Sequence, residues 1–107
     1  SLSFYGADEA GIEKLVKENE EWGIRIIEES TIIPAQVIWA VRNEMARTVE
    51  DFLARRTRIL FIDARLAIRL AASVAEIMKD EMNKDENWEK KQVSSFTKLA
   101  KGYILEN

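Results

Sequence analysis

The 107-residue sequence contains neither cysteine nor histidine. Without cysteine it can form no disulfide framework and no thiolate zinc site. Without histidine it lacks the commonest general base and the commonest metal ligand. The paired carboxylates Glu9/Glu13 and Glu76/Asp80 therefore lack the Glu-x-x-His ligands that complete the di-metal sites of helical bundles. We predict no metal site, and a solvated position for both pairs.

Proline and glycine are also scarce, because the chain has one proline and four glycines. Long helices can therefore run with few interruptions. The glycines, at Gly6, Gly11, Gly23 and Gly102, cannot form the phosphate-binding turn G-x-G-x-x-G in any register. The chain therefore lacks this dinucleotide-binding turn, and the family resemblance given below implies neither catalytic nor cofactor-binding residues in it.

Long apolar runs are missing as well. Runs such as residues 59–62 are far short of the roughly 20 residues that cross a bilayer. No signal or transit peptide is visible. The net charge of −3 gives no general attraction to nucleic acid or to anionic lipid. We predict a cytoplasmic protein that binds no nucleic acid and does not insert into a membrane.

Apolar residues do recur at helical spacing along most of the chain. The first stripes consist of Ile12, Leu15 and Val16 within residues 8–19, and of Val37, Ile38, Val41 and Met45 after Pro34. Proline fits the first turn of a helix, where its missing N–H costs nothing. Between these two helices, residues 20–33 combine Gly23 with β-branched residues, which predicts an irregular stretch with a turn and short extended pieces.

Further along the chain, Thr48-x-x-Asp51 resembles a capping box at a helix start. Residues 59–70 then place Ile59, Ile62, Leu66 and Leu70 on one helix face, and the pattern continues to Met82 after a kink near residues 71–73. Asn83 is suited to a left-handed helix end, and Asp85 to the start of a last helix. We expect the inner face of that helix to consist of Trp88, Val93, Phe96, Leu99, Ala100 and Tyr103.

These patterns predict an all-α fold. We expect a single compact bundle of about five helices that forms one domain over residues 1–107, with the irregular stretch near residues 20–33.

The charges are unevenly distributed. Seven of the eight arginines lie between residues 42 and 69. This segment contains no lysine and four acidic residues, so its net charge is +3. Residues 1–34 carry a net charge of −5. Arginine is weakly hydrated and can hold a carboxylate through two hydrogen bonds. A segment that uses arginine alone is therefore predicted to hold cations that are partly buried or docked.

Six of these arginines are candidates for contact with another domain or a partner. Asp51 lies four residues before Arg55, so a helix-surface ion pair is available there. Arg65 and Arg69 have no acid at helical spacing between them, and therefore most need a partner from outside the domain. We favour ion pairs over solvated surface, and both over direct contact with a phosphate ligand. The six candidates are Arg47, Arg55, Arg56, Arg58, Arg65 and Arg69.

The middle of the chain resembles a known family. The run EMARTVEDFLARRTR (residues 44–58) is similar to the signature of the carboxy-terminal domain of FAD-dependent glycerol-3-phosphate dehydrogenases, which the α-glycerophosphate oxidases share. The similarity continues through residues 63–65, 74–78 and 88–93, and covers the chain from about Tyr5 to Tyr103. Asn43, Ser73 and Asn83 depart from the family, which usually has His, Pro and Gly at these positions.

The resemblance implies a parent enzyme that oxidises sn-glycerol 3-phosphate to dihydroxyacetone phosphate. A bound FAD would pass the electrons to a quinone, or to oxygen in the oxidase branch. This chain would be a non-catalytic accessory domain whose partner is the FAD and substrate domain of its own parent. The resemblance also implies a parent that is a homodimer and peripheral on the cytoplasmic membrane.

The start of the chain and the charge pattern each allow a further interpretation. The start Ser1-Leu2 lacks methionine, and we interpret it as a cloning scar on a piece cut from a longer protein. Without the resemblance, the same patterns fit a freestanding helical interaction module with an arginine-rich docking surface. A nucleic-acid binder is disfavoured by the acidic remainder of the chain.

Overall fold

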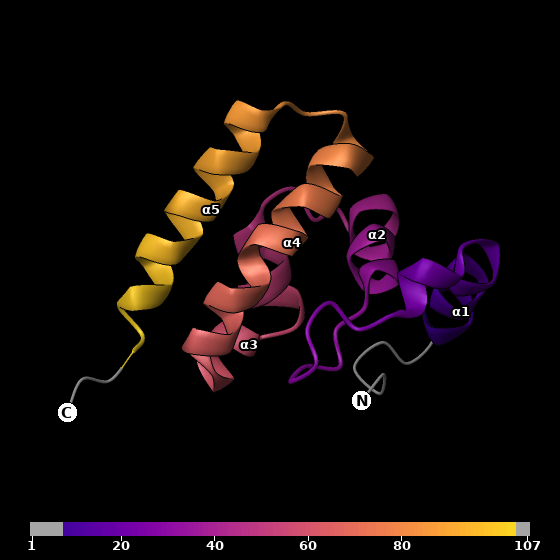
Figure 1. Ribbon diagram of the computed structural model, residues 1–107, viewed down its shortest axis with the longest axis horizontal. Coiled ribbons are helices and arrows are strands. Elements are labelled where there is room, and N and C mark those ends of the chain that lie inside the picture. The colour runs from indigo at the N-terminus through magenta and orange to yellow at the C-terminus, as the bar shows by residue number, and fades with distance from the viewer. Residues whose placement is uncertain (1–7, 105–107) are drawn as a thin grey trace.

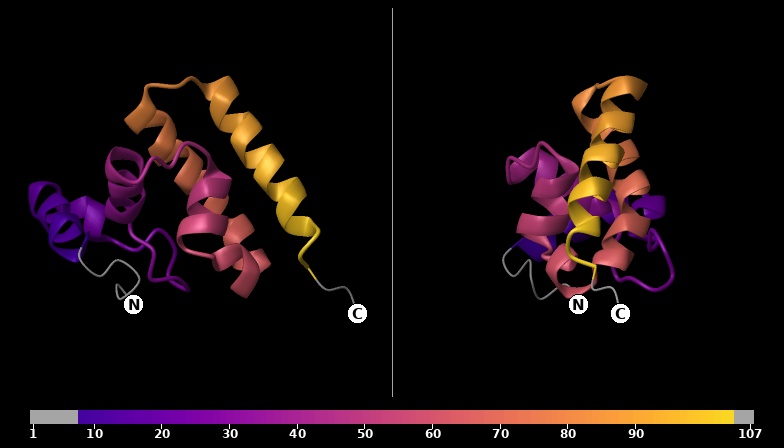
Figure 2. Two further views of the ribbon diagram at one scale, coloured as in Figure 1. Left: turned by 180° about the vertical axis from the view of Figure 1, so that it is seen from behind. Right: turned by 90° about the vertical axis from the view of Figure 1, so that its left-hand side faces the viewer.

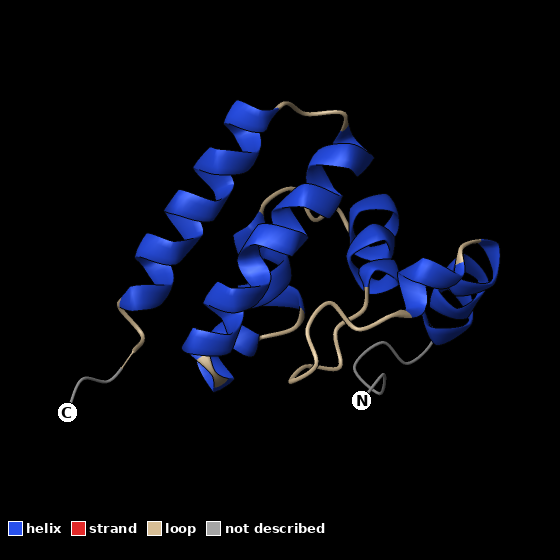
Figure 3. Ribbon diagram, viewed as in Figure 1, coloured by secondary structure: helices blue, strands red, loops and turns tan. Residues whose placement is uncertain are grey.

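The computed structural model describes residues 8–104, so Ser1-Leu2 lies outside the described residues. The α-helices are α1 (Glu9–Glu18), α2 (Pro34–Asn43), α3 (Ile59–Ile62), α4 (Ala64–Met82) and α5 (Glu86–Lys101) (Figure 1). A 3-10 turn, η2 (Glu20–Gly23), follows α1, and a π-helical segment, η3 (Asp51–Arg56), precedes α3. Within residues 8–104 there is no strand (Figure 3). The all-α prediction with about five helices is confirmed.

The two longest helices form an antiparallel hairpin. α4 and α5 are joined by a short turn, α2 and α3 lie against α4, and η3 contacts α2 and α3 (Figures 1 and 2). α1 lies on the far side of α2, away from α5. The C-terminal end of α5 therefore lies near α3, at the opposite end of the hairpin from the α4–α5 turn.

Two hydrophobic clusters hold these helices together. The larger one joins α2, η3, α4 and α5, and its largest fully buried side chains include Phe52, Leu53, Leu70 and Met78. The smaller one, between α1 and α2, contains Ile12, Leu15, Ala35 and Ile38. Full burial of one such large side chain stabilises the fold by about 1.5–3 kcal/mol. The apolar stripe predicted on the first helix is confirmed by its burial in this second cluster.

Local capping signals begin and end the helices as predicted. Thr48 Oγ1 accepts a hydrogen bond from the Asp51 N–H at 3.0 Å, and Asp51 Oδ2 accepts one from the Thr48 N–H at 3.2 Å. This reciprocal pair confirms the capping box. Asn83 ends α4 in the left-handed region at φ 56°, and the Asp85 carboxylate accepts from the Trp88 N–H at 2.8 Å.

The helix predicted over residues 59–70 is broken at Asp63. The Asp63 carboxylate accepts a hydrogen bond from the Leu66 N–H at 3.1 Å and starts α4, so α3 is a single turn. Ile62 therefore does not share a face with Leu66 and Leu70, and its side chain is 74% exposed. No break occurs near residues 71–73, where a kink was predicted, because α4 runs unbroken from Ala64 to Met82.

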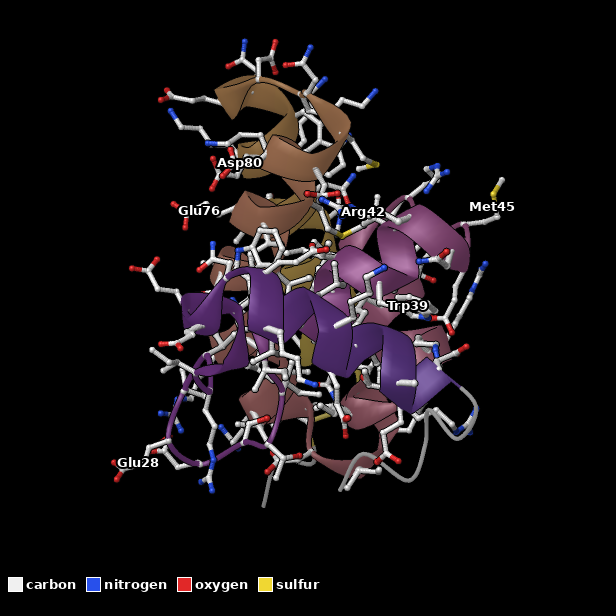
Figure 4. All side chains as sticks on the ribbon, turned by 90° about the vertical axis from the view of Figure 1, so that its right-hand side faces the viewer. Glu28, Trp39, Arg42, Met45, Glu76 and Asp80 are labelled. Carbon is white, nitrogen blue, oxygen red and sulfur yellow. The ribbon has the colours of Figure 1, made fainter. Side chains whose placement is uncertain are left out.

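Two residues assigned to inner helix faces are exposed. Met45 lies beyond the end of α2 at φ 62°, and its side chain is 73% exposed because the left-handed backbone turns it away from the stripe of Val37 and Val41. Figure 4 shows Met45 pointing away from the body of the molecule. Tyr103 lies beyond the end of α5, is 49% exposed, and packs edge-on against Phe61 at 5.3 Å between ring centres.

The stretch over residues 20–33 is irregular, as predicted. After η2 the chain makes a loop that is closed by a hydrogen bond from the Ile26 N–H to the Ile32 carbonyl at 3.0 Å. Ile24 and Ile33 have extended backbone without forming part of a strand. This loop places Glu29 beside α4, where its carboxylate pairs with Arg69.

Candidate functional site

The six candidate arginines lie between the end of α2 and the middle of α4. The structure divides them by their partners within the chain. Four of them, Arg47, Arg55, Arg56 and Arg69, contact carboxylates or backbone carbonyls of described residues. The other two, Arg58 and Arg65, form no ion pair with any residue in the range 8–104.

Arg56 is the most enclosed of the six. Its Nε lies 2.6 Å from Glu44 Oε1, its Nη2 lies 3.5 Å from Asp8 Oδ2, and its side chain is 23% exposed. It therefore ties η3 to the end of α2 and to the residue before α1. Arg55 lies 3.4 Å from Asp51 Oδ1, which confirms the predicted i, i+4 pair. Because Arg55 is 74% exposed, that pair contributes little to stability.

Arg47 is bound to the backbone rather than to a carboxylate. Its Nη1 donates to the carbonyl oxygens of Val41 at 3.0 Å and Ala46 at 2.7 Å. A cation at this place satisfies the Val41 carbonyl, which the end of α2 leaves without an intrahelical partner, and the Ala46 carbonyl of the following loop. The role of Arg47 in this chain is to hold the loop after α2.

Arg69 has a partner within the chain. Its Nη2 lies 2.5 Å from Glu29 Oε2 in the loop over residues 24–33. Arg69 therefore has an acid partner inside the domain, and its contact with another body stays a prediction. Acids at helical spacing do not reveal this pair, because an irregular loop brings Glu29 to α4 from 40 positions away.

Arg58 and Arg65 flank the short helix α3. Arg58 has a left-handed backbone at φ 61°, and its guanidinium lies 5.2 Å from the centre of the Phe61 ring. Arg65, in the first turn of α4, is exposed and forms no hydrogen bond with the part of the chain that the structure describes. Ile62, Arg65 and Tyr103 share a surface hollow of about 280 Å³.

A second hollow, of about 340 Å³, lies beside Arg55 and Arg56. Glu44 and Asp51 line it together with these two arginines. Each arginine already contacts one of the carboxylates, so the hollow has no surplus positive charge for a phosphate group. We therefore assign these two arginines to ion pairs within the fold rather than to an anionic ligand.

Within residues 8–104, no group of three or more carboxylates is arranged to hold a metal ion. Glu76 and Asp80 point outward from α4 (Figure 4). A dinucleotide needs a strand, a glycine-rich turn and a free helix N-terminus for its phosphates. Asp63 and Asp85 instead each accept a hydrogen bond from one N–H in the first turn of α4 and of α5, where their charge would repel a pyrophosphate.

Comparison with known families identifies the chain. The model of the C-terminal domain of alpha-glycerophosphate oxidase matches residues 2–92. The chain belongs to this family. The match includes the arginine-rich segment, the whole of α4 and the first turns of α5. No solved structure matches the chain significantly.

Curated relatives of this C-terminal domain are glycerol-3-phosphate dehydrogenases. The mitochondrial enzyme of Schizosaccharomyces pombe is 37% identical over 65% of this chain and 10% of its own length. The enzyme of Synechocystis sp. is 33% identical over 86% of this chain and 17% of its own length, and the mitochondrial enzyme of Arabidopsis thaliana is 31% identical over 83% and 14%. The chain thus spans less than a fifth of these relatives. Within residues 8–104, no helix is long and apolar enough to cross a membrane.

Proposed function

We propose that the chain, over residues 1–107, is a non-catalytic accessory domain of a longer FAD-dependent glycerol-3-phosphate dehydrogenase. The longer protein would oxidise sn-glycerol 3-phosphate to dihydroxyacetone phosphate and pass the electrons through FAD to a quinone or to oxygen. The family match over residues 2–92 carries this proposal. The small share of each relative that the chain covers supports the assignment of the chemistry to the remaining part.

The role proposed for this domain is structural. It would dock on the catalytic part of the same polypeptide, with arginines as contact residues. Of the six candidates, Arg58 and Arg65 suit this role best, since the other four are engaged inside the chain. A homodimeric parent, a cytoplasmic location and peripheral membrane association stay predictions, and several relatives are named mitochondrial.

The test begins with the coding sequence upstream of Ser1. An uninterrupted frame that contains a strand, a G-x-G-x-x-G turn and a helix is expected. The longer polypeptide should then show flavin absorbance and reduce a dye when given sn-glycerol 3-phosphate, whereas the 107-residue chain should do neither. A stop codon close to Ser1 and no flavoprotein partner would instead support a freestanding helical interaction module.

A further inference from the structure

Three large hydrophobic side chains gather at one corner of the surface. Phe61 is 49% exposed, Ile62 74% and Tyr103 49%, and only Ile24 and Met45 are comparable among the described residues. The Phe61 and Tyr103 rings meet edge to face at 5.3 Å. Ile62 and Tyr103 line one hollow with Arg65. We call this surface, formed by Arg58, Phe61, Ile62, Arg65 and Tyr103, the α3 corner.

The fold does not require apolar residues at this corner. Leu60, which is 1% exposed, anchors α3 in the main core, so Phe61 and Ile62 beside it face outward. The left-handed Arg58 and the non-helical Asp63 bound the turn and fix this presentation. A left-handed backbone at a residue other than glycine costs about 1–3 kcal/mol, and such positions cluster at binding sites. Contiguous apolar side chains on a surface mark a contact with another body.

The two arginines at the corner also lack carboxylate partners among the described residues. The guanidinium of Arg58 stacks over Phe61, and Arg65 has no carboxylate partner among residues 8–104. Arginine and aromatic residues are the types enriched in protein interfaces. A matching surface would place carboxylates or backbone carbonyls near the two arginines, around an apolar centre.

We propose that the α3 corner docks against the catalytic part of the same longer polypeptide, on a surface that carries carboxylates around an apolar patch. This inference rests on the proposed function. The matched family is described as the C-terminal domain of a longer protein. More than four fifths of the length of each relative lies outside the matched region. The occupant is therefore a body of protein that is covalently joined to this one.

The size of the corner favours a tethered partner. An independent complex uses about 20–30 residues on each side, whereas five residues make up the α3 corner. A covalent connection raises the local concentration of the partner, so a small interface suffices between domains of one chain. An anionic membrane fits less well, because the Asp63 carboxylate lines the hollow beside Arg65 and would face the lipid charge.

The experiment uses the longer polypeptide and compares the corner with a matched site. The variants Ile62→p-benzoylphenylalanine and Ile24→p-benzoylphenylalanine each carry a photocrosslinker at an exposed isoleucine, and Ile24 lies in a separate hollow. We expect illumination of the first to give crosslinks within one polypeptide, to peptides of the preceding catalytic part. The yield should exceed that of the second variant several-fold, and Arg65→Glu should lower it.

A second measurement separates docking from folding. Ile62→Glu should leave the Tm of the 107-residue chain unchanged, because the side chain is exposed there. In the longer polypeptide the same change should lower the Tm of this domain by several degrees, and Ile24→Glu should not. This readout needs no enzymatic activity, so docking can be confirmed even where the dehydrogenase activity is absent.

The other outcomes overturn the proposal. Crosslinks between two copies would identify the corner as a self-association surface. Sedimentation with vesicles of anionic phospholipid that Ile62→Glu abolishes, without crosslinks to the catalytic part, would identify a membrane contact. Equal crosslinking from positions 62 and 24 would show that the corner has no partner.

Discussion

Arg42 and Glu81 join α2 to α4 through a two-pronged ion pair. Arg42 Nε lies 2.7 Å from Glu81 Oε1, and Nη2 lies 3.2 Å from Oε2. The same guanidinium lies 5.9 Å from the centre of the Trp22 ring of η2. The hydrogen bonds that Arg42 donates to the Glu81 carboxylate raise the pKa of Arg42 above its ordinary value. One arginine thus links three elements, and Figure 4 shows it between α2 and α4.

Replacement of Arg42 by lysine tests this link. Arg42→Lys keeps the charge but loses the second hydrogen bond and the planar contact with Trp22. We expect the free energy of unfolding in urea to fall by about 0.5–1 kcal/mol, because Arg42 is nearly half exposed and the pair is screened by solvent. The control is Arg25→Lys, since Arg25 donates to the Glu28 carbonyl within its own loop. An equal loss in both variants would contradict a special role for the α2–α4 pair.

A second prediction concerns the Asp51 carboxylate, which organises the turn before η3. It accepts hydrogen bonds from the Arg47 N–H at 2.9 Å and the Thr48 N–H at 3.2 Å. Asp51→Ala should therefore lower the free energy of unfolding by about 1–2 kcal/mol. Its neighbour Glu50 is exposed, and its nearest ion-pair contact is 4.0 Å away, so Glu50→Ala should change stability little. Equilibrium urea denaturation of both variants checks the difference, and similar values would show that the capping box does not stabilise the fold.

The features that could be predicted from the sequence depend on neighbouring residues. The capping box of Thr48 and Asp51, the left-handed Asn83 and the Asp85 cap each involve residues within a few positions of one another. The Asp51–Arg55 pair belongs to the same class. Short-range geometry is set by backbone and side-chain chemistry alone, so residue types at fixed spacing suffice to predict it.

The features that could not be predicted depend on where a helix stops or on distant partners. Periodicity continued through residues 59–70, but the Asp63 cap interrupts the helix and leaves Ile62 outside. Arg69 finds Glu29 only because an irregular loop returns to α4. The α3 corner was missed for the same reason, since Ile62 and Tyr103 were assigned to inner faces. An aspartate three residues before Leu66 was the one local signal of the break.

A third prediction follows from Lys79 and Glu89, which join α4 to α5 at 3.0 Å between Nζ and Oε1. The hydrogen bond to Glu89 raises the pKa of Lys79 above its ordinary value of 10.5. A raised pKa in the folded state gives stability that is complete below the unfolded pKa and is lost as the pH rises through the folded pKa. The advantage of the wild type over Lys79→Met should therefore be constant at neutral pH and shrink above pH 10.5.

Thermal unfolding from pH 8 to pH 12 would measure this advantage. The control is Lys84→Met, because Lys84 is exposed and forms no ion pair within the described residues. The difference between the wild type and that variant should not change with pH. A difference for Lys79→Met that is equally flat would show that the contact between Lys79 and Glu89 does not stabilise the hairpin.

The last prediction concerns the contact between α1 and α2. A Cβ atom at Gly11 would lie 2.1 Å from Trp39 Cζ3 and 2.2 Å from Cη2. Trp39 packs against the smaller core, and its indole nitrogen is buried without a hydrogen-bond partner among the described residues (Figure 4). Alanine in place of glycine favours a helix by about 1 kcal/mol, but overpacking costs about 1–3 kcal/mol. We therefore expect Gly11→Ala to lower the Tm.

A control and a rescue make this prediction specific. Gly102 has φ −68°, and an added Cβ would meet only the Leu99 carbonyl oxygen, at 3.3 Å, so Gly102→Ala should not lower the Tm. In the background of Trp39→Phe, whose smaller ring vacates the space, Gly11→Ala should cost less than in the wild type. If Gly11→Ala instead raised the Tm, as helix propensity alone predicts, the close packing of α1 on Trp39 would be contradicted.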